Sequence, residues 1–331
     1  MSEQKLPTDL PLLKDLNIGN ITENVNAINS RCEDARMKFL FEKLVTHLHN
    51  FARETRLSIP EWAAALRFLV EVGQISNDVR HEFILLSDVL GLSLLVDAID
   101  HPKPPNTTEG TVLGPFHTTD AQHVESGEQV SFDPNGEPLF VLCFIKDTNG
   151  RPIPNVCIDV WETDSKGFYD VQYENRSSPD GRAILTSDQD GMFAFKAIVP
   201  VPYPIPSDGP VGKLLEKLNR HCYRPSHMHF MFKKQGYSQL ITALYLRNDP
   251  YETSDAVFGV KESLIVDLHQ VSDVEGLREK YDLASDMKLL EYEFVLVTDE
   301  ESDCLREEEA RRQAMKEGAN IKVVNGLLIS K

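Results

Sequence analysis

Two histidines separated by one residue, His227 and His229, lie in the apolar segment 224–232, which has the composition of a buried strand. Residues i and i+2 of a strand share a face, so both imidazoles are expected to project to the same side. Neutral imidazoles in apolar surroundings are good ligands for a metal ion. The alternative is a pair of core histidines that bond to the backbone, so a metal site requires further ligands elsewhere in the chain.

Two tyrosines occupy positions where a rigid backbone could hold a phenol. Tyr169 follows the tight turn 164–167, and Tyr203 lies in the segment 198–206, whose four prolines predict a rigid extended loop. Taken singly, each tyrosine is better explained as an ordinary half-buried side chain. Together with the histidines they would offer two phenolate oxygens and two imidazole nitrogens. A free phenol has a pKa of about 10, so binding both as phenolates requires a strongly charged ion, which favours Fe(III) over Zn(II).

Composition limits the class of protein and its partners. The chain has 331 residues, 41% of them hydrophobic, which is typical of a globular protein with one large or two ordinary domains. Its formal charge of -18, from 52 acidic and 34 basic residues, argues against nucleic acid and against an anionic membrane surface as partners, so neither is expected. The five cysteines are scattered without a Cys-x-x-Cys pair, and the first residues contain no apolar segment of signal-peptide length. We therefore expect a cytoplasmic protein.

The elements that must position these side chains begin with helices. Residues 1–20 are polar and predict an N-terminal extension, and residues 21–105 predict a helical domain. Apolar residues recur at helical spacing between 33 and 53, and the segment 58–61 resembles a capping box that opens a second helix. A third helix, predicted over 78–99, is apolar around most of its circumference. It must be covered on both sides, either by a partner subunit or by the next domain.

Helical patterning ends at the proline-rich segment 101–106, where we place the domain boundary. Residues 106–298 contain short segments of two-residue alternation separated by Gly, Pro and Asp turns. The predicted strands are 139–145, 156–161, 183–186, 192–199, 227–232, 239–246, 263–268 and 289–297. The predicted fold class is α+β, with an N-terminal helical domain followed by an antiparallel β-sandwich. Residues 299–331 predict a solvated, partly docked C-terminal tail with a short helix near 306–316.

At the candidate ligands the sequence resembles the intradiol ring-cleaving dioxygenases, the family of catechol 1,2-dioxygenase and hydroxyquinol 1,2-dioxygenase. The matching segments are 159–169, 198–203, 208–210 and 224–230, which carry the two tyrosines and the two histidines in the order of the family. The resemblance extends over about residues 20–298 and includes the helical domain. Four separated ligand motifs in the right order make it specific.

The resemblance implies a non-haem Fe(III) enzyme that cleaves a small aromatic diol or triol with O2 to a muconate-type diacid. It implies Tyr169 and His227 as equatorial ligands. Tyr203 and His229 would be axial ligands, and Tyr203 would leave the iron when substrate binds. Arg224, the charged residue beside the histidine strand, matches the family residue that stabilises negative charge on the substrate ring.

The resemblance also indicates which residues surround the substrate. The segment 111–116 resembles the family segment that closes the pocket, with apolar walls and a glycine that allows close backbone approach. The expected substrate-binding residues are Leu85, Asp88, Val112, Leu113, Gly114, Pro115, Phe116, Ile205, Pro206, Ala243 and Val257.

Two of these residues bear on which ring is cleaved. Many bacterial catechol enzymes carry a glutamine where this sequence has Ala243, and the segments 85–88, 203–212 and 256–261 resemble hydroxyquinol enzymes. Asp88 lies in an otherwise apolar helix, where an unpaired carboxylate costs several kcal/mol. The third hydroxyl of benzene-1,2,4-triol could satisfy it, and so could a backbone amide or water. Hydroxyquinol 1,2-dioxygenase activity is predicted, with catechol 1,2-dioxygenase activity as the alternative.

Further expectations concern assembly and the class of function. The resemblance suggests a homodimer formed through the helical domain, with a lipid-like molecule bound there. A non-enzymatic alternative is a carrier or interaction module in which the histidines are structural. About one iron per chain and a red to burgundy colour would distinguish the enzyme from that module.

Overall fold

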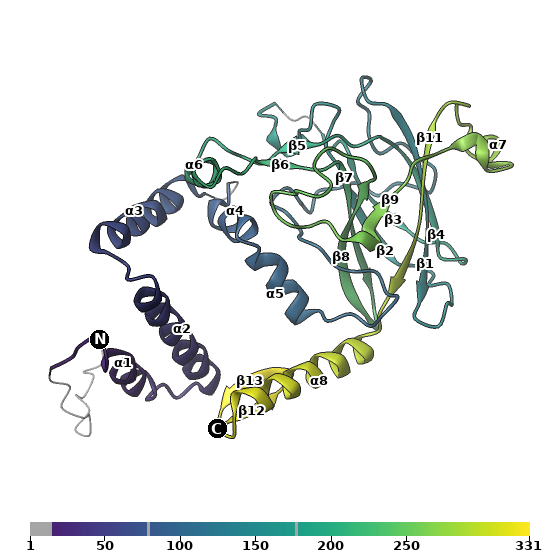
Figure 1. Ribbon diagram of the computed structural model, residues 1–331. Coiled ribbons are helices and arrows are strands. Elements are labelled where there is room, and N and C mark those ends of the chain that lie inside the picture. Colours follow the sequence, from purple (N-terminus) through teal and green to yellow (C-terminus); the bar gives the residue numbers. More distant parts are fainter. Residues whose placement is uncertain (1–14, 78–79, 176–177) are drawn as a thin grey trace. The chain divides into compact units, whose positions relative to one another are not determined.

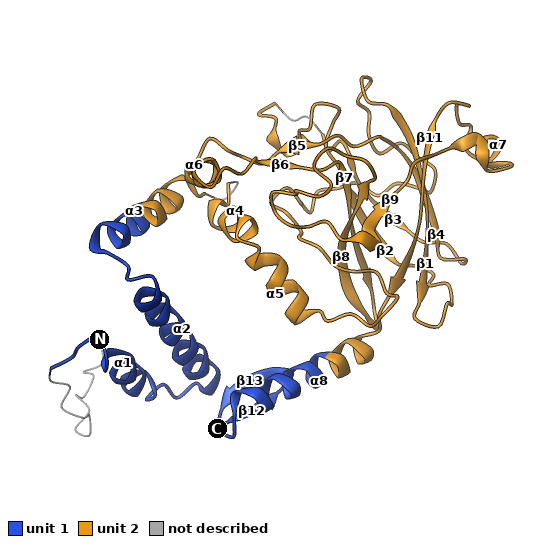
Figure 2. Ribbon diagram, viewed as in Figure 1, with its two compact units in different colours: residues 1–67, 306–331 blue, residues 68–305 orange. Residues whose placement is uncertain are grey.

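The computed structural model describes residues 15–77, 80–175 and 178–331. The chain forms two compact units, residues 1–67 with 306–331 and residues 68–305 (Figures 1 and 2). The helices are α1 (Ile21–Asn29), α2 (Ala35–Glu54), α3 (Ile59–Ile75), α4 (Glu82–Val89), α5 (Leu92–Asp100), α6 (Pro210–Lys217), α7 (Leu277–Tyr281) and α8 (Asp299–Glu317), with the 3-10 turns η1 (Asp170–Gln172), η2 (Glu262–Leu264) and η3 (Val271–Asp273). The strands are β1 (Pro138–Asp147), β2 (Cys157–Trp161), β3 (Arg182–Thr186), β4 (Met192–Ile198), β5 (Tyr203–Pro204), β6 (Tyr223–Arg224), β7 (His227–Lys234), β8 (Tyr237–Leu246), β9 (Ile265–Val266), β10 (His269–Gln270), β11 (Lys288–Leu296), β12 (Ile321–Val324) and β13 (Leu327–Ser330).

The first unit joins the N-terminal helices to the C-terminal residues. α2 lies at the predicted place and begins after Asp34, whose carboxylate caps the helix by accepting from the backbone N–H groups of Arg36 and Met37. Strand β13 packs against α2, and Arg36 donates to the carbonyl oxygen of Leu328 at 2.6 Å. The C-terminal residues are thus an integral part of this unit.

The tail was predicted to be solvated and partly docked with a short helix near 306–316, and that helix is longer than predicted. α8 has 19 residues, and the two apolar runs about Asn325 form the hairpin β12–β13. A reciprocal cap opens α8, because Glu301 accepts from Thr298 Oγ1 at 2.7 Å while Thr298 Oγ1 accepts from the Glu301 N–H. This Thr-x-x-Glu signal is visible in the sequence, and it places the start of the helix several residues before the predicted one.

The capping box predicted for α3 is present. The carboxylate of Glu61 accepts from the backbone N–H and the hydroxyl of Ser58, at 2.9 and 2.6 Å. In return, the N–H of Glu61 lies 3.4 Å from the Ser58 hydroxyl. The two residues therefore fix the entry into α3 as expected.

The single helix predicted over 78–99 is instead two helices, α4 and α5; its predicted start lies outside the described residues. The break occurs at Gly91, which adopts a left-handed backbone with φ of +73°. Glycine carries no Cβ penalty in that conformation, so it ends α4 and lets the chain begin α5 in a new direction. Apolar periodicity alone does not show such a break, because both helices are apolar.

The second unit contains the β-sandwich. One sheet has the strand order β10-β11-β1-β4, the other has the order β3-β2-β7-β8-β9, and β5 and β6 form a separate pair. The predicted antiparallel arrangement holds for most pairs, but β1 pairs with β11 and β8 pairs with β9 in parallel. Each parallel partner is reached through a long connection, which parallel pairing requires. The strand predicted over 263–268 is the turn η2 followed by the short β9.

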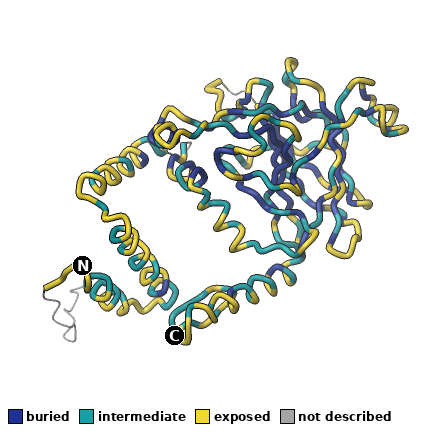
Figure 3. Tube along the Cα trace, viewed as in Figure 1, coloured by how far each residue is buried: buried dark blue, intermediate teal, exposed yellow. Residues whose placement is uncertain are grey.

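The core lies between the two sheets and follows the two-residue alternation of the strands. Val141 and Cys143 of β1 and Phe193 and Phe195 of β4 meet alternate residues of β2, β7 and β8 in one buried cluster. Figure 3 shows the buried residues gathered within this sandwich. The α+β class with an N-terminal helical region is therefore confirmed.

The compact units do not divide at the boundary predicted near residue 105. Val72 of α3 and Leu85 of α4 are buried together with Val112 and Ile205, which lie beyond that boundary. Apolar contact thus joins the end of α3 and all of α4 to the sandwich unit.

Two observations bear on the environment of the protein. All five cysteines are free thiols. Within the described ranges, no helix combines the length and the apolar character that a membrane span requires.

A buried ion pair connects β3 to the segments beside Tyr169. The guanidinium of Arg182 bonds to the carboxylate of Asp170 through Nε at 2.9 Å, and its Nη atoms reach Thr118 and the carbonyl oxygen of Phe116. The side chains of Arg182 and Asp170 are only 2% and 6% exposed. We expect Arg182→Met to lower stability by roughly 3 to 5 kcal/mol, because it leaves the buried carboxylate without this partner.

Thermal denaturation followed by circular dichroism measures this effect, and the expected decrease in Tm is about 10 °C. Arg311→Met is the matched control, because Arg311 is 64% exposed and pairs with Glu307 on the surface of α8. Loss of such a pair costs less than about 1 kcal/mol. Equal decreases in Tm for the two variants would contradict the structural role of Arg182.

Candidate metal centre

Four side chains bring their polar atoms together beside the second sheet. The hydroxyl oxygens of Tyr169 and Tyr203 are 3.2 Å apart, and the Tyr203 oxygen is 3.4 Å from Nε2 of His227. The Nε2 atoms of His227 and His229 are 3.1 Å apart. All four side chains are buried. The structure therefore unites the four ligands that the sequence predicted.

Strand alternation positions the two histidines. Met228 and Phe230 of β7 point into the sandwich core, so His227 and His229 project from the opposite face. On that face, His229 lies opposite Trp161 of β2 and Ala243 of β8. The Trp161 ring stacks on the His229 ring with centroids 4.8 Å apart and planes at 7°, which fixes the orientation of the imidazole.

The two tyrosines reach the cluster from separate segments. The N–H of Tyr169 donates to the side chain of Gln172, the last residue of η1, and the ring of Phe116 stacks on the Tyr169 ring at 4.7 Å. Tyr203 lies on β5 and pairs with Arg224 on β6. Both phenols are thus held from the backbone as well as by ring contacts.

The protonation states suit a metal ion. Nδ1 of His227 lies 2.7 Å from the carbonyl oxygen of Pro225, which can only accept, so Nδ1 carries the proton and the Nε2 lone pair faces the cluster. Burial, followed by the charge of Arg224, holds the pKa of His227 well below its usual range. Burial and then His227 do the same for the pKa of His229. Both imidazoles are therefore neutral at neutral pH, as a metal ligand must be.

The donor set fits an ion of high charge. Burial and the adjacent Tyr203 raise the pKa of Tyr169 well above its usual range, so a strong Lewis acid is needed to hold it as a phenolate. Ligands about 2.0 Å from a metal in a tetrahedral arrangement lie roughly 3.3 Å apart, close to the spacings found here. Among the described residues, no group of three or more His, Cys, Asp and Glu is arranged for a metal, so a metal ion at His227 and His229 would need the two phenols as further ligands.

Arg224 is fixed beside the cluster by partners that the sequence did not reveal. Its Nε and Nη2 each lie 3.2 Å from the Asp255 carboxylate, Nη2 also donates to the Tyr245 hydroxyl, and Nη1 is 3.0 Å from Nε2 of His227. Burial lowers the pKa of Arg224, but Asp255, Tyr245 and Tyr203 together outweigh it, so the pKa is raised well above its usual range. Tyr245 lies opposite His227 across β7 and β8, so only the strand register could have identified it.

The predicted substrate-binding residues fall into several groups. Leu85, Val112, Ile205 and Val257 belong to one buried apolar cluster, and Ala243 is buried opposite His229. A pocket of about 710 Å³ is lined by residues that include Leu85, Pro115, Phe116 and Pro206. Phe116 connects this pocket to the four clustered side chains, because it stacks on Tyr169.

Three predicted pocket residues differ in their surroundings. Gly114 has φ of +74°, and a Cβ there would lie 3.9 Å from Nε2 of His229. A side chain at this position would therefore occupy space next to the His229 imidazole. Leu113 is 36% exposed and is the least buried of the predicted set. Asp88 is 4% exposed on α4. Burial raises its pKa, while a hydrogen bond from Ser93 and the charge of Arg224 offset part of that rise.

Comparison with known proteins gives consistent relatives. A family model described as Dioxygenase matches residues 112–299, and one described as Catechol dioxygenase N terminus matches residues 34–108. An intradiol ring-cleavage dioxygenase of Aspergillus niger is 63% identical over 318 residues, which cover 96% of this chain and 96% of the relative. A hydroxyquinol 1,2-dioxygenase of Rhizobium sp. is 44% identical over 259 residues, covering 78% of this chain and 88% of the relative. The crystal structure of hydroxyquinol 1,2-dioxygenase from Pseudomonas putida has a TM-score of 0.81 at 40% identity, covering 85% of this chain and 99% of that one.

The four-donor cluster predicts how single substitutions change metal binding. We expect the iron content of His227→Ala to be at least about tenfold lower than that of the unmodified protein, because the substitution removes one of the two imidazoles on the core strand. Tyr203→Phe should retain iron but lose part of the visible absorption, because one phenolate remains. Iron content by mass spectrometry and the visible spectrum of the purified variants test both expectations.

His221→Ala is the matched control, since His221 bonds to Ser254 on the surface and lies outside the cluster. It should keep the iron content and the spectrum of the unmodified protein. An unchanged metal content and spectrum in His227→Ala or Tyr203→Phe would remove that residue from the site.

Proposed function

This chain belongs to the intradiol ring-cleavage dioxygenases, and on that premise we propose that it cleaves hydroxyquinol (benzene-1,2,4-triol) with O2. The ring opens between adjacent hydroxylated carbons and gives a diacid of the muconate or maleylacetate type. The cofactor is a non-haem Fe(III) held by Tyr169, Tyr203, His227 and His229. The proposal rests on the convergence of these four donor atoms, whose successive distances from Tyr169 through Tyr203 and His227 to His229 are 3.2, 3.4 and 3.1 Å.

When bound, Fe(III) would hold both oxygens of a catecholic substrate and make its ring reactive toward O2. The chain supplies a group that removes a substrate proton. Oη of Tyr203 lies between Oη of Tyr169 and Nε2 of His227, on the two-residue strand β5. As a phenolate, it can accept a proton from a substrate hydroxyl as it leaves the cluster.

Arg224 supplies positive charge where the ring reacts. Asp255 fixes its guanidinium from one side, and the backbone N–H groups of Val257 and Gly259 hold that carboxylate at 3.2 and 2.9 Å. The guanidinium therefore does not need to move in order to stabilise negative charge that develops on the substrate ring. A donor fixed in advance in a buried site contributes more than the same donor in water.

Asp88 supports a triol as the substrate. Its carboxylate is buried on α4, close enough to Arg224 and Asp255 for their charges to change its pKa. A third ring hydroxyl would give this carboxylate a hydrogen-bond donor that catechol lacks. Ala243, opposite His229, presents only a methyl group where a larger polar side chain would compete for that space. The relatives named as hydroxyquinol 1,2-dioxygenases agree with this preference.

The substrate preference tests this proposal. We expect a higher kcat/KM for hydroxyquinol than for catechol, and Asp88→Leu should reduce that ratio roughly ten- to a hundredfold, because a buried hydrogen bond is lost. Asp88→Asn should have a smaller effect, since its amide oxygen can still accept. Steady-state oxygen uptake with both substrates gives the ratios.

Asp286→Leu is the control, because Asp286 is exposed in the loop before β11. It should leave the ratio unchanged. Faster turnover of catechol by the unmodified protein would favour catechol 1,2-dioxygenase activity, and an unchanged ratio in Asp88→Leu would leave Asp88 without a role in selection.

The protein is further proposed to be a homodimer that associates through its helical domain and holds a lipid-like molecule there. α2 supports this proposal, because Leu40, Leu44, Leu48 and Phe51 recur at helical spacing and are each 44% to 56% exposed. An apolar stripe of this kind on a surface helix usually meets a partner.

Light scattering coupled to size exclusion should give twice the chain mass of 37.4 kDa. The double variant Leu44→Glu with Leu48→Glu should shift the mass toward one chain, because a buried unpaired carboxylate costs several kcal/mol. Asn50→Glu, at an exposed polar position of the same helix, should remain dimeric. A single-chain mass for the unmodified protein would refute the dimer.

A further inference from the structure

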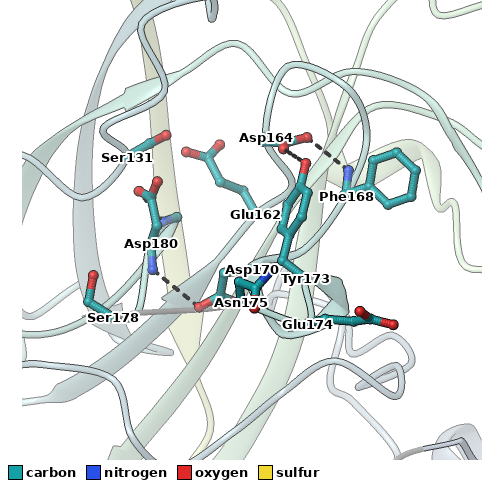
Figure 4. Close-up of a pocket in the computed structure, with 11 residues that line it drawn as sticks. Ser131, Glu162, Asp164, Phe168, Asp170, Tyr173, Glu174, Asn175, Ser178 and Asp180 are labelled. Carbon is teal, nitrogen blue, oxygen red and sulfur yellow. Dashed lines mark hydrogen bonds between the residues drawn. The ribbon is translucent and has the colours of Figure 1, made fainter.

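Two pockets beside the candidate metal centre differ in what their charged groups do. The pocket in Figure 4 is lined by acidic residues, but its Asp170 already pairs with Arg182, so its charge alone does not indicate a ligand. A pocket of about 610 Å³ is lined by residues that include Asp255, Arg220 and Phe258. The proposed reaction uses neither Arg220 nor Phe258, although both lie next to residues that it does use.

Arg220 follows α6 and bonds to two segments that are far apart in the chain. Its Nη1 donates to the carbonyl oxygen of Val89 at 2.7 Å, and its Nη2 donates to the carbonyl oxygen of Ala256 at 2.8 Å. Val89 is the last residue of α4, where carbonyl groups lack intrahelical partners and the helix dipole favours a cation. One guanidinium therefore ties the end of α4 to the loop 255–259.

Both of these segments carry groups that the proposed reaction uses. α4 carries Asp88, the proposed acceptor for a third ring hydroxyl. The loop carries Asp255, which fixes Arg224, and Val257, which belongs to the apolar cluster around the substrate. Burial raises the pKa of Asp88, and the charges of Arg224 and Asp255 also act on it, so the two segments face the same region. Their separation therefore sets how far Asp88 lies from Arg224.

Phe258 gives this tie a second contact. Its backbone has φ of +61°, a left-handed conformation that is strained for a bulky side chain. The Arg220 guanidinium carbon lies 4.8 Å from the centroid of the Phe258 ring, within the range of a cation–π contact. A Cβ on Gly91, directly beyond α4, would lie 3.6 Å from the same ring. Because the ring is 48% exposed, these contacts rather than deep burial offset the backbone strain.

We propose that Arg220 is a positioning residue of the substrate pocket, an inference that rests on the proposed hydroxyquinol activity. Its two hydrogen bonds hold Asp88 and Arg224 at the separation that a triol ring requires. A guanidinium suits this role because its planar fork donates to two acceptors at once, which a lysine ammonium does less well. The loop has further bonds, from Thr111 to the Gly259 carbonyl oxygen and from the Ala256 N–H to Tyr223, so loss of Arg220 should shift it rather than unfold it.

Hydrogen–deuterium exchange of the iron-loaded protein tests the tie without any substrate. Arg220→Met keeps the aliphatic stem but removes the donors, so the amides of 88–92 and 255–259 should exchange at least about threefold faster, while those of β7 stay unchanged. Arg220→Lys should give a smaller increase, because one ammonium cannot reproduce the planar fork. Lys217→Met, at an exposed position in the last turn of α6, is the control and should exchange like the unmodified protein.

Oxygen uptake with hydroxyquinol and catechol tests the consequence for selection. Arg220→Met should lower the ratio of the two kcat/KM values about three- to tenfold at unchanged iron content, which is less than the loss of the Asp88 carboxylate itself causes. In an Asp88→Leu background the same substitution should not lower the ratio further, because Arg220 acts through that carboxylate. A purely structural role would instead reduce activity toward both rings alike in both backgrounds.

Each measurement has an outcome that contradicts the proposal. Unchanged exchange in both segments of Arg220→Met refutes the tie, and an unchanged ratio, or an equal decrease in the Asp88→Leu background, refutes the role in selection. If Arg220→Met does not fold, Arg220→Lys decides by the same two measurements. Faster turnover of catechol by the unmodified protein refutes the proposed substrate instead, and the exchange pattern still decides whether Arg220 ties the two segments.

Discussion

The register of β7 between β2 and β8 is the constraint on which the candidate metal centre depends. In this register His229 lies opposite both Trp161 and Ala243, and His227 lies opposite Tyr245. Because side chains alternate, Met228, Phe230 and Phe232 fill the sandwich core while the imidazoles face the phenols. A shift of one residue would place the imidazoles in the core and phenylalanines at the cluster. The same apolar contacts that stabilise the sandwich therefore keep the ligands on the correct face.

Two buried ion pairs hold the segments around that strand. Arg224 with Asp255 fixes the guanidinium near His227, and Arg182 with Asp170 links β3 to the residue after Tyr169. A buried pair adds little to stability, since desolvation offsets most of the attraction, but it is costly to break. Its value here is geometric, because each pair ties a segment beside the four clustered side chains to a neighbouring element.

The surroundings of the cluster formed by the two tyrosines and two histidines combine apolar walls with a few polar groups. The apolar side chains of Leu85, Val112 and Val257 cannot form hydrogen bonds and exclude water, whereas Arg224 and Asp88 present opposite charges within the same region. Selection among rings that differ by one hydroxyl requires such a contrast. An apolar wall rejects an added hydroxyl only weakly, while a buried acceptor rejects a ring that lacks the matching donor.

The sequence by itself determined the residue types of the site and most of the elements that hold it. His227, His229, Tyr169 and Tyr203 were visible because strand alternation and proline-rich loops are local properties, readable without knowing any partner. Local signals also predicted α2, the cap of α3 and most strands of the sandwich. They failed at Gly91, because apolar periodicity continues through the break between α4 and α5 and only the backbone conformation ends the first helix.

Tertiary structure alone decided which distant residues complete the site. Asp255 and Tyr245 belong to it because the loop before η2 and the register of β8 bring them to Arg224. The parallel pairing of β1 with β11 and the packing of β13 on α2 join segments far apart in the chain. No periodicity in the sequence encodes these contacts. They depend on which long-range arrangement buries the most apolar surface while pairing the backbone groups, and that is a property of the whole chain.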